Sequence, residues 1–162
     1  RNRLIVIVPK ANSARIQRLQ DLARTGVKLV LGAEAVPIGH YSRTVLQQLS
    51  RDRDFGGDFA TRVLRNVVSE EENVKSVVGK VQLGEADAGI VYRSDVTPAV
   101  ARFIRVLELP GSANVLASYP ISLIQGAKES AAGRAFMALV LSPEGQQILE
   151  RNGLIPVAPS HL

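Results

Sequence analysis

The 162-residue sequence contains no cysteine and no tryptophan, and only 4% of its residues are aromatic. The absence of cysteine excludes disulfides, thiolate catalysis and zinc sites with cysteine ligands. With so few aromatic side chains, the core has to be built mainly from valine, leucine, isoleucine and alanine. A chain of this length forms one ordinary domain or a pair of small lobes.

Long apolar runs are also missing, and none reaches the roughly 18 residues that are needed to span a bilayer. The basic start Arg1-Asn2-Arg3, followed by the apolar run Leu4–Val8, superficially resembles a signal peptide. That run is short and rich in β-branched residues, and no small-residue cleavage site follows it. We therefore expect a buried strand at residues 4–8 and no signal peptide in this chain.

Side chains and motifs that carry catalysis are scarce. Only two histidines occur, His40 and His161, and neither has a second histidine or a cysteine at a metal-ligand spacing. We find no nucleophile elbow, no Ser-His-Asp order, no P-loop and no dinucleotide-binding glycine motif. The glutamates at 70–72 are better interpreted as acidic residues in a first helical turn than as a metal site. The sequence predicts no enzyme, no catalytic residue and no cofactor.

The net charge is +5, and basic residues outnumber acidic ones mainly in the first 70 residues. A basic half of the chain can attract an anion or a nucleic acid. A solvated basic surface explains the surplus of positive charge equally well. Neither interleaved aromatic and basic residues nor a recognition-helix pattern is present. We therefore expect no nucleic-acid partner, and titration with short DNA at low salt tests that alternative.

Strand-like and helix-like patterns alternate along the chain, which predicts an α/β fold with a largely parallel sheet flanked by helices. Ser69 and Glu72 have the spacing of a capping box ahead of the helical valine stripe that begins at Val74. Residues 51–58 are typical of a flexible surface insertion. Strands are expected at 4–8, 27–31, 66–68, 87–92, 103–109, 115–118 and 121–125, and helices at about 16–23, 37–49, 59–65, 70–82, 129–141 and 143–152.

Two predicted helix starts and one tyrosine could together hold an anion. The first turn of a helix has unpaired N–H groups and a partial positive charge, and one such start follows Val36 while another precedes Val74. Tyr92 ends an apolar strand, at the sheet edge where open α/β folds bind ligands. Each feature also has a structural explanation, since residues 37–39 suit a tight loop, Val74 belongs to a core stripe, and Tyr92 suits a strand end.

Several segments resemble, in order, the periplasmic or extracytoplasmic molybdate- and tungstate-binding proteins of ABC importers. The resemblance covers nearly the whole chain, and the first three segments together are its most specific part. The segments are residues 36–41 (VPIGHY), 71–74 (EENV), 84–92 (GEADAGIVY), 119–121 (YPI), 141–146 (LSPEGQ) and 153–154 (GL).

The resemblance implies a role for each residue of the site. Ile38 and Val74 would donate backbone N–H groups to the oxyanion, and Tyr92 would donate its hydroxyl. Pro37, Gly39 and Asn73 would shape the site. Related archaeal proteins add carboxylate ligands to the metal, and Val74 stands where one such glutamate would lie. The resemblance therefore implies a tetrahedral molybdate or tungstate ligand, with no metal bound directly by the protein.

The same resemblance implies how the chain is organised. Residues 1–119 would form a hinge strand and a complete second lobe of the type II periplasmic-binding-protein fold. Residues 120–162 would return to an incomplete first lobe, whose N-terminal part we expect before Arg1. The implied location is periplasmic or extracytoplasmic, and the implied partner is the permease of the importer. Apolar side chains on the two C-terminal helices, such as Phe136 and Ile148, favour a dimer or a swapped oligomer.

A regulator's effector domain is the alternative from another class, because such domains share the fold and sense small anions. A helix-turn-helix segment ahead of Arg1 would favour the regulator, whereas a signal peptide there would favour the transporter.

Overall fold

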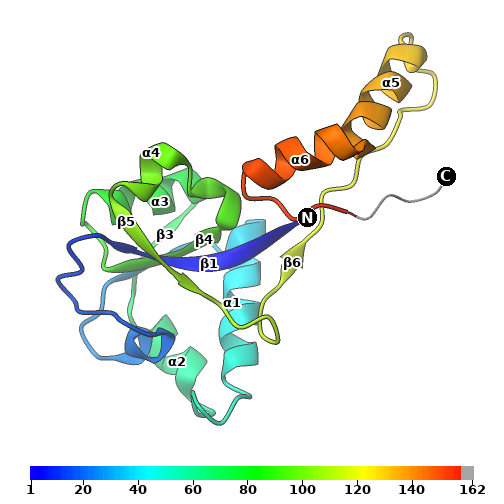
Figure 1. Ribbon diagram of the computed structural model, residues 1–162. Coiled ribbons are helices and arrows are strands. Elements are labelled where there is room, and N and C mark those ends of the chain that lie inside the picture. The colour runs from blue at the N-terminus through cyan, green and yellow to red at the C-terminus, as the bar shows by residue number, and fades with distance from the viewer. Residues whose placement is uncertain (158–162) are drawn as a thin grey trace.

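The computed structural model describes residues 1–157, and a mixed β-sheet lies at their centre (Figure 1). Its strand order is β3-β2-β4-β1-β5, and β6 pairs with the beginning of β1. The strands are β1 (Asn2–Pro9), β2 (Leu29–Gly32), β3 (Val67–Glu71), β4 (Ala88–Tyr92), β5 (Ile104–Glu108) and β6 (Leu116–Ala117). Each of these strands was predicted from the sequence, with small shifts at the ends. The segment at 121–125 was also predicted as a strand but does not form one.

The sheet is mixed, so the expectation of a largely parallel sheet is only partly correct. Strand β2 is parallel to both β3 and β4, whereas β1 runs antiparallel to β4, β5 and β6. Leu4 to Val8 have no exposed surface, because β1 lies between two strands and is covered on both faces. The continuous apolar run that predicted this strand is therefore explained by its central position.

Helices cover both faces of the sheet. Helix α1 (Pro37–Leu49), α2 (Phe59–Leu64) and the 3-10 helix η1 (Leu19–Ala23) bury residues that share one cluster with Leu4 and Ile90. Helix α3 (Val74–Gln82) covers the other face and packs its valines against Ile5 and Val91. A short 3-10 helix, η2 (Arg93–Asp95), and the one-turn helix α4 (Pro98–Ala101) follow β4.

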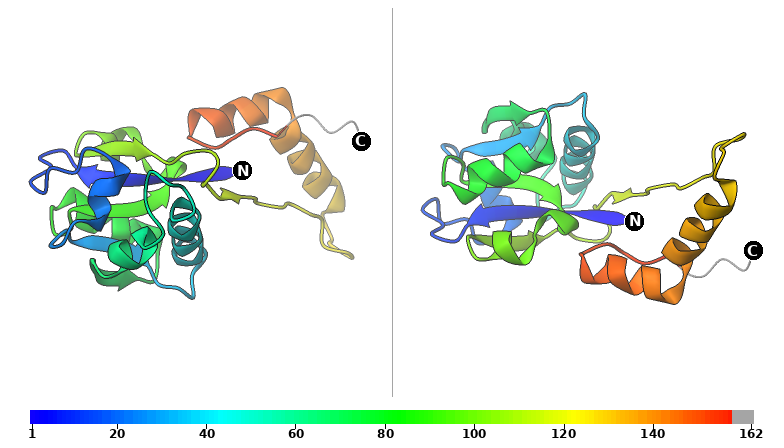
Figure 2. Two further views of the ribbon diagram at one scale, coloured as in Figure 1. Left: turned by 90° about the horizontal axis from the view of Figure 1, so that it is seen from below. Right: turned by 90° about the horizontal axis from the view of Figure 1, so that it is seen from above.

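Helices α5 (Ser130–Leu141) and α6 (Pro143–Arg151) form an arm that stands away from the sheet (Figure 2). Ser142 caps α6 by accepting a hydrogen bond from the Gly145 amide at 3.1 Å. The segment after α6 returns to the start of β1, where Ile155 and Arg1 exchange two backbone hydrogen bonds. These two helices were predicted, and none of the side chains of α5 is buried. No helix among residues 1–157 is both long enough and apolar enough to cross a membrane.

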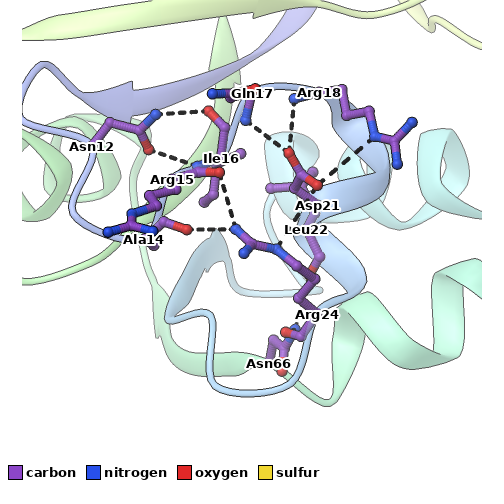
Figure 3. Close-up of polar contacts among 10 residues, drawn as sticks. All are labelled: Asn12, Ala14, Arg15, Ile16, Gln17, Arg18, Asp21, Leu22, Arg24 and Asn66. Atoms are coloured by element: carbon purple, nitrogen blue, oxygen red, sulfur yellow. Dashed lines mark hydrogen bonds and ion pairs between the residues drawn. The ribbon is translucent and has the colours of Figure 1, made fainter.

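The predicted helix around residues 16–23 is wrong in type and extent, because side chains hold this segment in another conformation (Figure 3). The Asn12 amide group bonds the backbone N–H and C=O of Ile16, and Arg15 is left-handed with φ of 53°. Asp21 accepts the Gln17 and Arg18 amides at 2.8 and 3.1 Å. Only the five residues of η1 are helical, although Ile16 and Leu22 are buried as the helical face predicted.

Residues 51–58 are not simply a flexible surface insertion. The Phe55 ring is 9% exposed and meets the Phe59 ring edge to face, with ring centroids 4.9 Å apart. The segment therefore contributes one aromatic side chain to the core, while its charged neighbours are exposed.

The predicted strand at 121–125 is also wrong. Ile121 and Leu123 have strand-forming side chains, but residues 120–129 are exposed and pair with no other strand in the part of the chain that the structure describes. A strand needs a neighbour to satisfy its backbone groups, so propensity alone does not form one here.

Candidate functional site

The start of helix α1 lies directly after the C-terminal end of β2. Val36 is extended at the N-cap, Pro37 takes the first helical position as predicted, and Val36 O accepts the Gly39 and His40 amides at 3.0 and 3.1 Å. The Ile38 side chain is 3% exposed, so its identity serves the core. In the part of the chain that is described, the Ile38 amide makes no hydrogen bond and is available as a first-turn donor.

Gly39 is required by the fold itself. A Cβ atom at this position would lie 1.9 Å from Ala33 O and 2.4 Å from Gly32 O. The missing side chain therefore lets the first turn of α1 approach the end of β2. The resemblance implied that Gly39 shapes the oxyanion site, and the contact that the structure describes is with the protein's own backbone.

Helix α3 begins differently from the prediction. Its N-cap is Asn73, whose side-chain oxygen accepts the Ser76 amide at 3.0 Å, and the capping box of Ser69 and Glu72 does not form. Ser69 and Glu71 lie instead in strand β3, which pairs with β2 as far as Gly32. The glutamates at 70–72 therefore lie outside the helix, and its first turn carries no acidic residue. Val74 takes the first helical position, where its amide has no partner among residues 1–157.

Tyr92 ends strand β4 opposite Leu4 of β1 and is half-buried. Burial, together with smaller contributions from the neighbouring Tyr119, Tyr41 and Asp95, raises the pKa of Tyr92 to about 12. A phenol with this pKa stays protonated at neutral pH and can donate a hydrogen bond. Asp95 accepts the Tyr92 amide at 2.9 Å, and burial raises the pKa of this carboxyl group against the effect of that hydrogen bond.

The three predicted donors belong to elements of the same sheet region. Ile38 lies in the first turn of α1 on one face, Val74 begins α3 on the other face, and Tyr92 ends strand β4 between them. Helices α1 and α3 cover opposite faces, and both begin at the edge where the parallel strands β2 and β4 end. Val74 packs against both apolar clusters, which places it at this edge, and Tyr92 packs against the cluster on the α1 side. The arrangement offers neutral dipoles to an anion. Among the described residues, no three His, Asp or Glu side chains are grouped so that they could hold a metal.

A separate cavity of about 510 Å³ lies beside this edge, between η2 and the segment that follows α6. Arg93, Ser94 and Gly153 are among the residues that line it, whereas Ile38, Val74 and Tyr92 do not. His40 is exposed on α1, and His161 lies outside the described residues.

One polar network near Tyr92 was not predicted from the sequence. Asn2, which is 1% exposed, donates its side-chain amide to Ser94 Oγ at 2.8 Å and to the Tyr119 hydroxyl at 3.4 Å. It thus joins the start of β1 to the segments that follow β4 and β6. The detectable signal was an asparagine two residues before the apolar run Leu4–Val8, since an amide that is buried at the start of a central strand needs partners.

Comparison with known proteins identifies the family. Residues 1–155 match the family model of the bacterial extracellular solute-binding proteins. The chain is also 32% identical over 152 residues to the molybdate-binding protein ModA of Mycobacterium tuberculosis, an alignment that covers 94% of the chain and 53% of the relative. The chain belongs to the bacterial extracellular solute-binding proteins. The resemblance that the sequence motifs indicated is therefore confirmed.

Comparison with solved structures identifies the fold of this solute-binding protein. A structure described as the substrate-binding domain of a molybdenum ABC transporter from Clostridium difficile matches with a TM-score of 0.76 and 29% identity, over 97% of this chain and 64% of that one. The periplasmic molybdate-binding protein of Azotobacter vinelandii matches with a TM-score of 0.65 and 17% identity, over 96% and 67%. The predicted α/β fold of type II periplasmic binding proteins is confirmed. The chain spans about half the length of the curated relatives that it matches.

Proposed function

We propose that this chain forms part of a solute-binding protein that captures molybdate or tungstate for an ABC importer. The proposal is supported by the placement of two helix starts, those of α1 and α3, at the edge of the sheet where strand β4 ends in Tyr92. The names of relatives that share up to 32% identity with this chain support the choice of oxyanion. In this role the protein binds its ligand and does not convert it.

Neutral donors suit a tetrahedral dianion. The Ile38 and Val74 amides and the Tyr92 hydroxyl would each donate one hydrogen bond to an oxyanion oxygen, and two helix starts add favourable partial charge. Pro37 and Asn73 would fix the first turns from which those amides point, and Gly39 would seat α1 against β2. Val74 offers no carboxylate to the metal, which favours tetrahedral coordination.

The remaining expectations about the whole protein follow from this role. Residues 1–119 would be one ligand-binding lobe with its hinge strand, and residues 120–162 would return into the other lobe, which would supply the remaining donors. The protein would act outside the cytoplasm and deliver its oxyanion to a membrane permease. The exposed Phe136 and Ile148 would be covered in the working assembly, by the rest of the other lobe or by a second copy.

Substitution of Val74 tests the site sharply. In Val74→Pro the backbone N–H is lost at a position where proline fits, because Val74 is the first helical residue and Asn73 is extended with φ of −149° and ψ of 156°. We expect molybdate to bind about ten- to a hundredfold more weakly, since a hydrogen bond to a charged group contributes about 1.5–3 kcal/mol.

The matched control is Val74→Ala, which removes the side chain and keeps the amide. It should bind molybdate within about threefold of the wild type, since only the amide is proposed to contact the ligand. Equal affinities of the proline and alanine variants would remove Val74 from the site.

A further inference from the structure

Arg43 connects the first turn of α1 to the elements around it. Its side chain is only 15% exposed, and Nη1 donates to Gly39 O at 3.0 Å and to Gly32 O at 3.2 Å. Nη2 donates to Glu70 Oε1, and Nε lies 3.9 Å from Glu34 Oε2. One guanidinium group therefore joins the end of β2, the start of α1 and strand β3. Its planar, forked donors suit such multiple contacts, whereas a lysine ammonium does not.

A β-bulge in β3 places Glu70 on the face of the sheet where Arg43 lies. Leu29 pairs with Val67 and Val30 pairs with Ser69, so Val68 is an extra residue in the ladder. Beyond this bulge, Glu70 lies beside Leu31, whose side chain belongs to the cluster under α1. Ser69 lies beside Val30 on the opposite face.

The other face carries a second ion pair that agrees with this alternation. Lys80 of α3 donates to Ser69 Oγ at 2.8 Å and to Glu71 Oε1. Consecutive glutamates of one edge strand therefore bind the two helices on opposite faces of the sheet. The Lys80 contact lowers the pKa of Glu71, and the hydrogen bond from Ser69 lowers it further.

We propose that Arg43, held by Glu70, is a positioning residue for the oxyanion site. The inference rests on the proposed function and adds a residue to it. Arg43 touches no ligand in this account. It fixes the first turn of α1 against β2 and so sets the position and direction of the Ile38 amide.

A charge effect is the competing explanation, since an arginine near the site could attract a dianion without positioning anything. Two variants distinguish these explanations by their effect on the affinity for the anion. Arg43→Lys keeps the positive charge and loses the fork, so a pure charge effect leaves affinity unchanged whereas loss of positioning weakens it. Glu70→Gln removes a negative charge, so a pure charge effect strengthens anion binding whereas loss of positioning weakens it.

The experiment measures the affinity of the full-length protein for molybdate by calorimetry in Arg43→Lys, Arg43→Gln and Glu70→Gln. We expect both arginine variants to bind about tenfold more weakly, and Glu70→Gln about threefold more weakly, because misplaced donors lose interaction steeply with distance. The matched control is Arg62→Gln, which breaks the exposed 3.2 Å ion pair with Asp58 on α2 and should bind as the wild type does.

Hydrogen exchange of the ligand-free protein provides a readout that does not depend on ligand identity. Amides of residues 39–42 should exchange faster in Arg43→Gln and Glu70→Gln than in the wild type and Arg62→Gln. If wild-type protein bound neither molybdate nor tungstate, the proposed function would fail, and the exchange rates would still decide whether Arg43 holds α1. Wild-type affinity in Arg43→Lys, tighter binding in Glu70→Gln, or unchanged exchange in Arg43→Gln would each overturn the positioning role.

Discussion

The Asn73 side-chain oxygen accepts hydrogen bonds from both the amide and the hydroxyl of Ser76, at 3.0 and 3.2 Å. This contact satisfies one of the free donors in the first turn of α3 and leaves the Val74 amide open. The helix start that we assign to the oxyanion site therefore depends on one exposed side chain.

Asn73→Ala should lower the free energy of unfolding by about 1 kcal/mol, as loss of an N-cap typically does. Chemical denaturation of the wild type and the variant measures the difference. Thr97→Ala is the control, because Thr97 caps only the one-turn helix α4 through a longer 3.4 Å contact. Equal effects of the two substitutions would contradict the importance of the Asn73 cap.

Substitution by alanine should have opposite effects on stability at Gly39 and at Gly79. A Cβ at Gly39 would meet backbone oxygens at 1.9 and 2.4 Å, whereas a Cβ at Gly79 in α3 meets nothing within 4 Å. Gly39→Ala should be destabilising by more than about 3 kcal/mol, since the start of α1 has to move away from β2. Gly79→Ala should be stabilising by about 0.5–1 kcal/mol through its better helix propensity. Thermal unfolding of both variants tests the pair, and a tolerated Gly39→Ala would contradict the close approach.

Phe55 should behave as a core residue although it lies in a loop. Phe55→Ala leaves a void beside Phe59, and we expect a loss of about 3 kcal/mol in the free energy of unfolding. Phe103→Ala is the matched control, because that ring is 56% exposed and its removal should cost less than about 1 kcal/mol. Denaturant titration gives both values, and a neutral Phe55→Ala would restore the interpretation of residues 51–58 as a surface insertion.

Tyr92 should ionise near pH 12, well above the ordinary tyrosine pKa of 10.0. Because the pKa is raised on folding, the stabilising contribution of the neutral phenol is complete below pH 10 and is lost as the pH rises toward 12. Tyrosinate absorbance of the wild type and Tyr92→Phe, recorded by rapid pH jump, should therefore coincide between pH 10 and 11. A difference with a midpoint near 10 in the native protein would contradict the effect of the partial burial of Tyr92 on its pKa.

Local patterns were sufficient for elements whose own side chains decide their structure. The valine stripe of α3, Pro37 at the start of α1 and the apolar strand β4 all predicted what the structure contains. The proposed donors lie where those elements begin or end, so the sequence predicted the places in the fold of these residues, while their role as a binding site stays a prediction.

Side-chain hydrogen bonds and strand pairings that the local patterns do not display decided the rest. Ser69 and Asn73 are both good N-cap residues, and pairing of β3 with β2 determined which of them starts the helix. Asn12 and Asp21 replaced a plausible helix with side-chain hydrogen bonds to the backbone. Arg43 could not be assigned at all, because its role depends on a bulge at Val68 that only the sheet register reveals.

The central claim is tested most directly by calorimetric titration of the full-length protein with molybdate, tungstate, sulfate and phosphate. The account predicts tight binding of molybdate and tungstate, which are too similar in size for neutral donors to separate them strongly, and much weaker binding of sulfate and phosphate. Preference for sulfate or phosphate would contradict it.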